Sequence, residues 1–523
     1  MTIRLVSAIV SGLALVLAFP PFGLGFLAWF ALVPLLLSLE GQSGRRGFLL
    51  GLASGFAFFL GSVYWVVHSM SNYGGVPVVT SIGVMLLLVL YLGLYWGAFG
   101  LFSTLTAGID RTARLMLLPA FWVALEYARG NLFTGFPWVL IGYTQSDYLP
   151  LIQVADTTGV WGVSFAVVAS NTALSFIAGH LIRKERGSLP LVPAAIAALL
   201  VASITSYGFI RMKAVESEVA RWSGMRVGVA QGSIDQGLKW DGRYQEETLD
   251  IYTGLTEKAS GRFAKLIIWP ETAIPFYYEP EKIEEGPVGE LARKTGSFIL
   301  TGSPSYTYNP ATNEVRYFNS AFLINSAGET VGKYEKFHLV PFGEYVPLRG
   351  ILPFGKLTAG IGDFSVGPGP LPIAFEGGGI GTLVCFESIF PEIARGHVKN
   401  GATMLANITN DAWFGYTSAP YQHFQMSVFR AVENRTFLVR SANTGISAVI
   451  DPNGRIRERT GLFERTVITD DVRLRQGGLT FYTSYGDLFA WGSTIITGVF
   501  IGTRLMISRS KLRENHRHVR NNN

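Results

Sequence analysis

The sequence predicts a multi-pass α-helical membrane domain of about eight spans, joined to an α/β domain built as a layered sandwich. The first observation is composition: 49% of the 523 residues are hydrophobic and only 15% are charged, which is too apolar for an ordinary soluble domain. The second is that most of the long apolar runs lie before residue 210. The third is a polar block at 215–480, where short β-branched runs alternate with helix-like stretches.

Eight apolar runs are candidates for membrane spans. A helix needs about 20 residues to cross the hydrocarbon core, so the first, second and fifth runs are short. Pro20 and Pro21 separate the first two runs, because proline cannot continue a helix interior. No small-residue cleavage site follows the first run, so we interpret it as a retained anchor. The runs cover residues 5–20, 23–38, 47–68, 79–107, 114–128, 158–182, 189–209 and 486–507.

The basic residues indicate the orientation of these spans. With the N-terminus inside and seven spans before residue 210, eight of the nine Lys and Arg residues in that region fall in cytoplasmic segments, Arg129 being the exception. The tail after the eighth run is also basic, and together these features give the positive-inside bias. We therefore expect a seven-helix membrane domain at 1–214 and an extracytoplasmic domain at 215–480. A final helix and a basic cytoplasmic tail occupy 481–523, so both termini are cytoplasmic.

Charge and cysteine usage exclude several classes of protein. The net charge is +6, but the basic residues do not form a patch with base-stacking aromatics, so we expect no nucleic-acid partner. One cysteine rules out an internal disulfide framework and a multi-cysteine zinc site. His338 and His423 do not stand in an HxxxH or HxH spacing. We interpret both as structural and expect neither a metal nor another cofactor.

Turn signals divide the polar block into strands. The segments DPNG at 451–454 and SAG at 326–328 lie between strand-like runs and predict hairpin turns. Helix-like stretches at 285–295 and 421–436 alternate with the strands. This alternation favours an α/β sandwich over an all-β barrel.

Three residues at the ends of strand-like runs are candidates for chemistry: Glu271, Lys336 and Cys385. Taken singly, each residue also has a purely structural explanation: a solvated carboxylate, a surface lysine or a small buried core residue, respectively. Together they suffice for acyl transfer without a histidine. A carboxylate accepts the thiol proton, and an ammonium lowers the thiol pKa or stabilises the oxyanion of a tetrahedral intermediate.

Longer motifs surround these three residues and extend into the membrane half. In them the chain resembles the bacterial apolipoprotein N-acyltransferases, a membrane branch of the nitrilase, or carbon–nitrogen hydrolase, superfamily. The resemblance implies an αββα sandwich for the polar block. The motifs are RGNLFTGFPWVLIGYTQ (129–145), QGSIDQGLKWD (231–241), WPETAIP (269–275), KFHLVPFGEYVP (336–347), CFES (385–388) and NITNDAWFG (407–415).

The resemblance also implies the roles of the site residues. Glu271 is the expected general base, Lys336 the oxyanion-stabilising cation and Cys385 the nucleophile that becomes acylated. The residue after the cysteine is often Tyr in the family and is Phe386 here, so its backbone N–H is retained but a phenol is not. The expected supporting or substrate-binding residues are Trp240, Glu344, Phe386, Glu387 and Trp413.

Three of these supporting residues have alternative roles. Glu344 and Glu387 are expected either to position loop groups and Lys336 or to transfer protons directly. Trp413 belongs to an aromatic segment at 411–424. That segment is either a mobile lid at the membrane interface or an ordinary packing loop.

The function implied by the resemblance is lipoprotein maturation. Cys385 takes an acyl chain from a membrane phospholipid, with phosphatidylethanolamine the expected donor, and passes it as a thioester to the N-terminal amino group of a diacylglyceryl-cysteine apolipoprotein. We expect a monomer in the bacterial inner membrane, with the catalytic domain on the periplasmic side. The alternatives are a membrane-anchored amide hydrolase, a transporter with an extracytoplasmic binding domain, and a non-catalytic lipoprotein chaperone.

Overall fold

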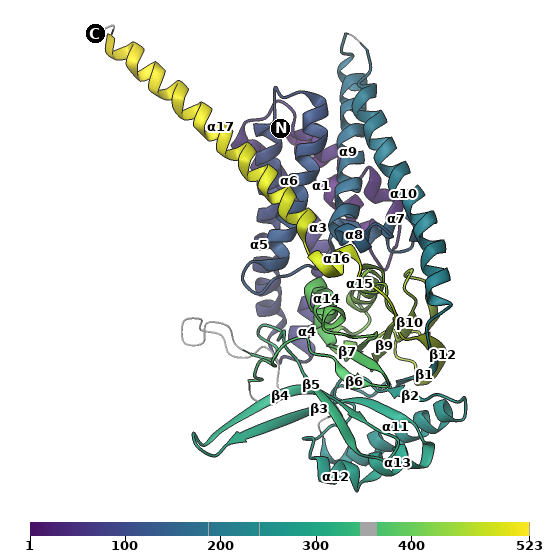
Figure 1. Ribbon diagram of the computed structural model, residues 1–523. Coiled ribbons are helices and arrows are strands. Elements are labelled where there is room, and N and C mark those ends of the chain that lie inside the picture. Colours follow the sequence, from purple (N-terminus) through teal and green to yellow (C-terminus); the bar gives the residue numbers. More distant parts are fainter. Residues whose placement is uncertain (187, 240, 346–362, 522–523) are drawn as a thin grey trace.

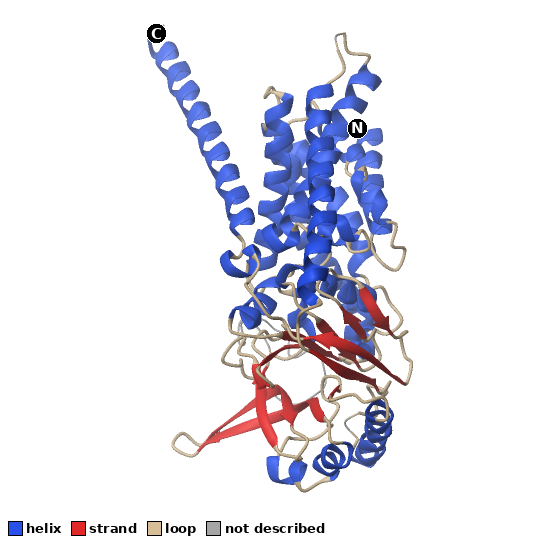
Figure 2. Ribbon diagram, turned by 45° about the vertical axis from the view of Figure 1, so that its right-hand side comes forward, coloured by secondary structure: helices blue, strands red, loops and turns tan. Residues whose placement is uncertain are grey.

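The chain folds as a helical bundle standing on an α/β sandwich (Figure 1). The computed structural model describes residues 1–186, 188–239, 241–345 and 363–521. The start of α1 and the end of α17 lie at the end of the bundle away from the sandwich, as the turned view in Figure 2 also shows. The strands gather at the other end of the molecule.

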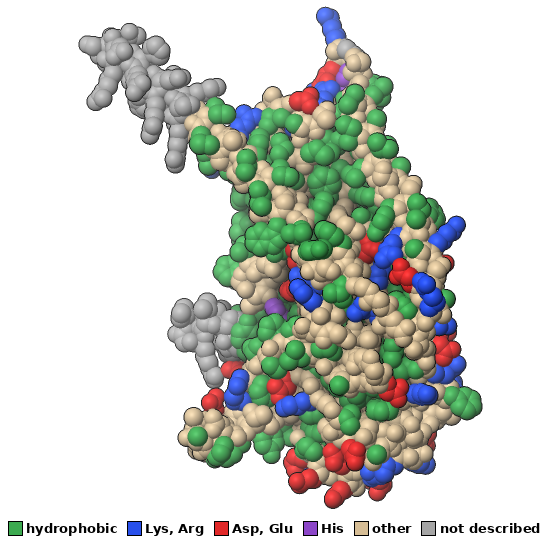
Figure 3. All heavy atoms as spheres, in the orientation of Figure 1, with side chains coloured by type: hydrophobic (Ala, Val, Ile, Leu, Met, Phe, Trp, Pro, Cys, Tyr) green, Lys and Arg blue, Asp and Glu red, His purple; other side chains and the backbone are tan. Residues whose placement is uncertain are grey.

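Within the described residues, five helices are long and apolar enough to cross a membrane. A surface view agrees with this assignment, because hydrophobic side chains dominate the bundle while charged side chains concentrate on the sandwich and near the far end of the bundle (Figure 3). The five helices are α3 (Gly44–Val63), α5 (Val78–Leu105), α9 (Val160–Arg183), α10 (Leu191–Val219) and the Leu488–Ile507 part of α17 (Leu488–Asn521).

The remaining predicted runs form shorter or interrupted helices. The run at 23–38 is split into the 3-10 helix η1 (Gly25–Trp29) and α2 (Val33–Leu39). Proline stands in the first turn of α2, where it is tolerated because the N–H that it lacks would have no partner there. The first run is α1 (Thr2–Ala18), and the fifth is α6 (Arg111–Asn131), which has a proline inside it and several charges. Short helices complete the bundle: α4 (Trp65–Asn72), η2 (Ile141–Gln145), α7 (Leu149–Ile152), α8 (Ala155–Thr158) and α16 (Phe481–Tyr485).

Glycines bring α3 and α5 into close contact. A Cβ atom added at Gly51 would lie 2.2 Å from the main-chain oxygen of Trp96, and one added at Gly100 would lie 2.2 Å from that of Gly47. Small residues that let two backbones approach are the usual device of helix pairs in membranes, where the hydrophobic effect does not drive helices together. The α3–α5 pair therefore depends on residues without side chains.

Within the described part of the chain, twelve strands form two six-stranded sheets. The first has the order β12-β1-β2-β3-β4-β5 and the second β11-β10-β9-β8-β7-β6. Strands β1–β3 pair in parallel in one sheet and β7–β9 in the other, with antiparallel strands flanking both. The strands are β1 (Gly224–Gln231), β2 (Leu266–Ile268), β3 (Phe298–Asn309), β4 (Glu314–Ile324), β5 (Thr330–Glu335), β6 (Ile373–Phe375), β7 (Gly378–Val384), β8 (Met404–Thr409), β9 (Leu438–Ala442), β10 (Ala448–Ile450), β11 (Ile456–Arg459) and β12 (Thr466–Arg473).

The two sheets pack face to face around an apolar core. Val229 and Ile268 of the first sheet share this core with Val384, Ile408 and others of the second. Helices cover both outer faces, which gives the αββα layering. The first sheet carries η3 (Gly242–Tyr244), α11 (Gln245–Ser260), α12 (Pro280–Glu284) and α13 (Pro287–Thr295), and the second carries α14 (Pro391–Lys399) and α15 (Ala419–Asn434) (Figure 1).

Helices α14 and α15 join the sandwich to the bundle. Ile393, Phe424 and Phe429 belong to the same buried apolar cluster as Trp138, from the loop after α6, and Tyr143 of η2. Trp138 donates from its indole N–H to Gln422 on α15 at 2.7 Å. The second sheet is thus fixed to the membrane helices through its own covering layer.

The local predictions for the polar block are confirmed. Residues 451–454 connect β10 to β11, and residues 326–328 connect β4 to β5. The predicted helices at 285–295 and 421–436 correspond to α13 and α15. Turn residues and hydrophobic periodicity act over a few neighbouring positions, so the turns and helices that they predict are also present in the tertiary structure.

The glycine contact between α3 and α5 leads to a stability prediction. We expect Gly51→Ala to destabilise the protein by about 1–3 kcal/mol, because the new methyl group meets main-chain atoms that cannot move aside cheaply. Gly83→Ala on α5 is the matched control, since nothing lies within 4 Å of its added Cβ. Thermal unfolding in detergent micelles measures both, and equal melting temperatures for the two variants would contradict the close-approach account.

Candidate active site

A cavity of about 590 Å³ lies where the sandwich meets α4 and α5. Polar side chains enter it from the sandwich, whereas the side chains that α4 and α5 present to it are mainly apolar. The sandwich contributes Lys239, Glu271, Asn319, Lys336, Glu344, Cys385 and Asn410. The bundle contributes Trp65, Val66, Met70, Val84, Leu87, Leu88 and Tyr91.

The topology explains why the polar residues meet. Glu271 follows β2 and Lys336 follows β5 in one sheet, whereas Cys385 follows β7 in the other. These strands run so that their carboxyl ends reach the same edge of the sandwich, which is where sites in α/β proteins collect. The structure therefore brings all three residues that the sequence singled out to one cavity.

Cys385 stands at a sharp turn between β7 and the 3-10 helix η4 (Cys385–Ile389). Its φ angle is +55°, in the left-handed region that costs a non-glycine residue energy and is enriched at functional sites. The side chain is only 9% exposed. Asn407 supports the turn by donating to the main-chain oxygens of Leu383 at 2.9 Å and of Cys385 at 3.4 Å.

The Glu271 carboxylate is buried and held by donors from both sheets. One oxygen accepts from the Asn319 side-chain amide at 2.8 Å, and the other accepts from the Asn410 main-chain N–H at 2.9 Å. Gly302 on β3 makes room for this loop, because a Cβ there would lie 2.5 Å from the nitrogen of Thr272. Glu271 is therefore fixed in position but retains its acceptor chemistry.

Lys336 is buried and paired with a carboxylate. Its ammonium lies 2.8 Å from the Glu344 carboxylate, and its main-chain N–H donates to the main-chain oxygen of Asn319 at 2.9 Å. Burial by itself would lower the pKa of Lys336, but the carboxylates of Glu344 and Glu271 outweigh it and hold this pKa above its ordinary value. The side chain is thus a fixed positive charge.

The Cys385 thiol is coupled to both charges. Burial raises its pKa well above the ordinary value, the negative charge of Glu271 raises it further, and Lys336 opposes them. The resting side chain is therefore a thiol and not a thiolate. A thiol in this state would need a base in order to act as a nucleophile, and Glu271 is the carboxylate that affects its pKa most strongly.

Glu387 ties the cysteine turn to the lysine loop. One of its oxygens accepts from the main-chain N–H groups of Phe337 at 2.7 Å and His338 at 3.0 Å, and the other accepts from that of Val384 at 2.7 Å. The Tyr334 hydroxyl also donates to it at 2.9 Å. Burial raises the pKa of Glu387 to about 7, against the opposing effect of Lys336 and these amides.

Glu344 holds its own loop as well as Lys336. It accepts from the Val340 main-chain N–H and from the Asn319 amide, both at 2.8 Å. Asn319 thus bridges the carboxylates of Glu271 and Glu344. For both Glu344 and Glu387, these contacts favour the positioning alternative over direct proton transfer.

Sequence reasoning missed three residues of this cavity. Lys239 and Asn410 lie inside quoted motifs but were not singled out, whereas Asn319 on β4 gave no local signal. The Lys239 ammonium is buried and donates to the main-chain oxygen of Glu271 at 2.9 Å. Burial lowers the pKa of Lys239 to about 8, so its charge is held less firmly than that of Lys336.

The aromatic candidates lie on the bundle side of the cavity. Trp413 packs edge-on against Tyr73, and its main-chain oxygen accepts from Ser69 at 2.8 Å, so its segment rests on α4. Phe386 also lines the cavity and stacks on Trp138. Trp240 lies outside the described residues.

The two histidines differ in their surroundings. His423 is fully buried, with one ring nitrogen 3.0 Å from Asp411 and the other 2.8 Å from the Ser388 hydroxyl. His338 packs against the ring of Phe390, and burial lowers its pKa to about 4. In the described part of the chain, no group of three or more His, Cys, Asp or Glu side chains has the arrangement of a metal site.

Comparisons with known proteins agree with this architecture. The Carbon-nitrogen hydrolase family model matches residues 226–480, and the model of the Apolipoprotein N-acyltransferase N-terminal domain matches residues 11–173. The fold and the matched families define a membrane-bound enzyme of the carbon–nitrogen hydrolase class.

Proteins that match this chain over nearly its whole length identify a particular family within this class. The chain is 43% identical to the apolipoprotein N-acyltransferase of Geobacter metallireducens, over 97% of this chain and 95% of that protein. It is 34% identical to the one of Methylococcus capsulatus, over 93% of each. The chain belongs to the apolipoprotein N-acyltransferase family. Among solved structures it is similar to the C. elegans NitFhit protein, with 18% identity and a TM-score of 0.37 over 53% of this chain and 65% of that one, a likeness too weak to bear on function.

The coupling of the thiol to its neighbours can be measured directly. Cys385 is the only cysteine, so alkylation followed by intact mass reports on this thiol alone. We expect Glu271→Gln to lower the apparent thiol pKa, because a nearby negative charge is removed, and Lys336→Met to raise it.

The exposed residues Glu314 and Lys333 provide the matched controls Glu314→Gln and Lys333→Met, which should leave the pH profile of alkylation unchanged. If both site variants shifted the apparent pKa in the same direction, the electrostatic coupling described above would be wrong.

Proposed function

We propose that this chain transfers an acyl chain from a membrane phospholipid to the N-terminal amino group of a diacylglyceryl-cysteine apolipoprotein, through a thioester on Cys385. The observation that carries the proposal is the cavity, which joins Cys385 to the apolar face formed by α4 and α5. Leu87 is 66% exposed on that face, so an acyl chain in the bilayer has a continuous apolar path to the thiol. The activity named for the full-length relatives supports the same reaction.

We further propose how the chain sits in a bacterial inner membrane. The eight spans are the five long helices together with α1, the η1–α2 segment and α6, which places residues 1–214 and the last helix of 481–523 in the bilayer. The positive-inside bias supports cytoplasmic termini and a periplasmic sandwich at 215–480. The start of α1 and the end of α17 lie on the side of the bundle away from the sandwich, which supports the same orientation (Figure 1).

In the first half-reaction, Cys385 Sγ attacks the carbonyl carbon of the phospholipid ester. Glu271 accepts the thiol proton, and the oxyanion is stabilised by the Lys336 ammonium and by the backbone N–H of Phe386. The tetrahedral intermediate collapses as the C–O bond breaks. Glu271 returns the proton to the departing lysophospholipid alkoxide, which leaves an acyl thioester on Cys385.

In the second half-reaction, the free amino group of the lipoprotein attacks the thioester carbonyl. Glu271 accepts a proton from the amine, the same groups hold the oxyanion, and the C–S bond breaks to release the amide. Glu271 then returns its proton to the Cys385 sulfur. The apolar lining limits hydrolysis, because water has little access to a thioester held there.

The other residues support these steps. Glu344 and Glu387 position the lysine loop and the cysteine turn, and Trp240 and Trp413 contact the lipid substrates. We propose phosphatidylethanolamine as the preferred donor and a monomer as the active form. The amide-hydrolase alternative needs neither an apolar approach from α5 nor a membrane bundle, so these observations favour transfer.

Acylation of Cys385 is the direct test of this proposal. After incubation with phospholipid, we expect intact mass to show an acyl-sized gain on the wild-type protein, and a synthetic diacylglyceryl-cysteine peptide should then discharge it. Cys385→Ala should show no gain and at least a 1000-fold loss of transfer, on the order expected for removal of a nucleophile. Retained transfer by Cys385→Ala would refute the thioester route, whereas release of ammonia from simple amides without acyl transfer would favour the hydrolase.

The buried carboxylate of Glu387 gives a pH prediction. Its pKa of about 7 lies above the ordinary value, so it becomes protonated as pH falls through 7 and then loses an acceptor for the amides that it holds. We expect transfer at pH 6 to be about tenfold slower than at pH 8.

The variant Glu387→Gln should be slow at every pH and should lack this acidic decline, because an amide cannot titrate. Glu458→Gln, at an exposed position on β11, is the matched control and should keep the wild-type profile. An acidic decline that persists in Glu387→Gln would assign the titration to another group.

A further inference from the structure

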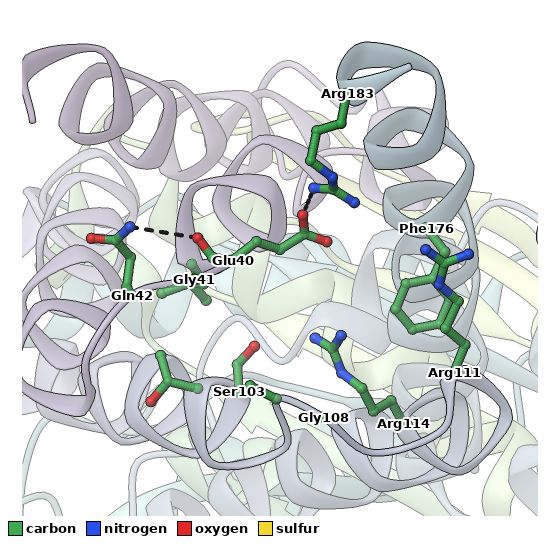
Figure 4. A pocket seen from close by; sticks show the side chains of 12 residues that line it. Glu40, Gly41, Gln42, Ser103, Gly108, Arg111, Arg114, Phe176 and Arg183 are labelled. Carbon is green, nitrogen blue, oxygen red and sulfur yellow. Dashed lines mark hydrogen bonds and ion pairs between the residues drawn. The ribbon is translucent and has the colours of Figure 1, made fainter. Parts of the chain in front are cut away.

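A second cavity lies at the end of the bundle opposite the sandwich. It has a volume of about 210 Å³, several times the roughly 30 Å³ that one water molecule occupies in the liquid. The loop after α2, the end of α5, the start of α6 and the end of α9 enclose it. Its lining includes Glu40, Ser103, Arg111, Arg114, Phe176 and Arg183 (Figure 4).

Two of the three arginines are neutralised by carboxylates. Arg111 lies 2.6 Å from Glu185, and Arg183 lies 2.8 Å from the same carboxylate. Arg183 also pairs with Glu40, as the dashed line in Figure 4 marks. These ion pairs neutralise Arg111 and Arg183. The positive charge of the remaining arginine, Arg114, is not compensated by them.

Arg114 has no hydrogen-bonding or ionic partner for its guanidinium among the described residues. Its Nε atom is buried without a partner, and the group lies 5.3 Å from the centre of the Phe176 ring. Figure 4 shows its guanidinium directed into the cavity. Three guanidinium groups thus face two carboxylates within the described part of this site. An unpaired buried donor of this kind is costly unless a ligand satisfies it.

The chemistry of the site fits a phosphate group. A guanidinium presents planar paired donors that match phosphate oxygens, and it is preferred wherever such recognition occurs. The N-terminal amides of α6 are not available, because the Asp110 side chain already accepts from Thr112 and Ala113. The ligand would therefore be held by side chains, with Arg114 as its principal donor.

The surroundings favour a lipid as the source of that phosphate. Leu105 on α5 and Leu181 and Ile182 on α9 are exposed apolar side chains at the same end of the bundle. They can line acyl chains that leave a headgroup held in the cavity. The site is also separate from the catalytic cavity, because Leu87 and Thr104 line the two cavities on the same helix and stand about 25 Å apart along it.

We propose that this cavity binds the phosphate of an anionic phospholipid, such as a phosphatidylglycerol headgroup, in the leaflet opposite the catalytic domain. A headgroup with net negative charge suits a site with one unbalanced guanidinium, whereas a zwitterionic headgroup brings its own ammonium. Basic pockets between helices on the cytoplasmic side of a membrane commonly bind such headgroups. The inference depends on the membrane embedding of the bundle and not on acyl transfer.

The test is lipid binding to the full-length protein in detergent micelles, followed by native mass spectrometry. Phosphatidylglycerol, phosphatidylethanolamine and inorganic phosphate are titrated against the wild type, Arg114→Gln and Arg46→Gln. Arg46 is exposed at the start of α3, at the same end of the bundle, so its variant removes an equal charge outside the cavity. Lipid bound in the catalytic cavity is common to all three proteins and cancels in the comparison.

We expect Arg114→Gln to bind phosphatidylglycerol at least tenfold more weakly than the wild type and Arg46→Gln do, and to bind phosphatidylethanolamine as they do. Unchanged binding of phosphatidylglycerol by Arg114→Gln would overturn the proposal. Equal weakening of the binding of both lipids in Arg114→Gln would overturn its selectivity for an anionic headgroup. Binding of inorganic phosphate as tight as that of phosphatidylglycerol would assign the site to a free anion instead of a lipid.

Discussion

The arrangement of the candidate active site depends on one buried carboxylate. Glu387 accepts hydrogen bonds from main-chain groups on both sides of the site, at Val384 before the cysteine and at Phe337 and His338 after the lysine. These segments belong to different sheets, so a single side chain sets the separation between Cys385 and Lys336. A neutral side chain could not accept from so many donors, because a carboxylate is the group that acts only as an acceptor. The other contacts at the site adjust the relative position of Cys385 and Lys336 that Glu387 establishes.

The position of the site relative to the bilayer has a different cause. Helices α14 and α15 cover one sheet and at the same time belong to the apolar core of the bundle. The cysteine turn lies directly before α14, so this packing places the thiol beside the membrane helices (Figure 1). A soluble αββα sandwich would expose the same helices to water. In this chain they contact the bundle through apolar side chains such as Phe424 and Phe429 and through hydrogen bonds such as that from Trp138 to Gln422, which fixes the polar site at the end of the bundle.

Much of the fold was predictable because its signals are local. The turns at 451–454 and 326–328, the helices α13 and α15, and the strand β7 that ends directly before Cys385 all follow from residue patterns within a few positions. The break between η1 and α2 was missed, because hydropathy does not register a change of helix type within an apolar run. At the site, Asn319 was missed for a related reason: an asparagine within a strand has no pattern of its own, and its role comes only from the carboxylates that the fold brings to it.

The sequence by itself determined the apolar runs, the bias in basic residues on which the proposed orientation rests, and the residue types capable of acyl transfer. Motifs at Glu271, Lys336 and Cys385 also gave the family. The tertiary structure decided which of these groups share a cavity, how Glu387 and Asn319 connect them, and that Arg114 stands unpaired at the far end of the bundle. The physical reason is that hydropathy and turn chemistry act over a few residues. The distances and charges of a site are set by strands and helices that are remote in the chain and meet only when the two sheets and the bundle pack.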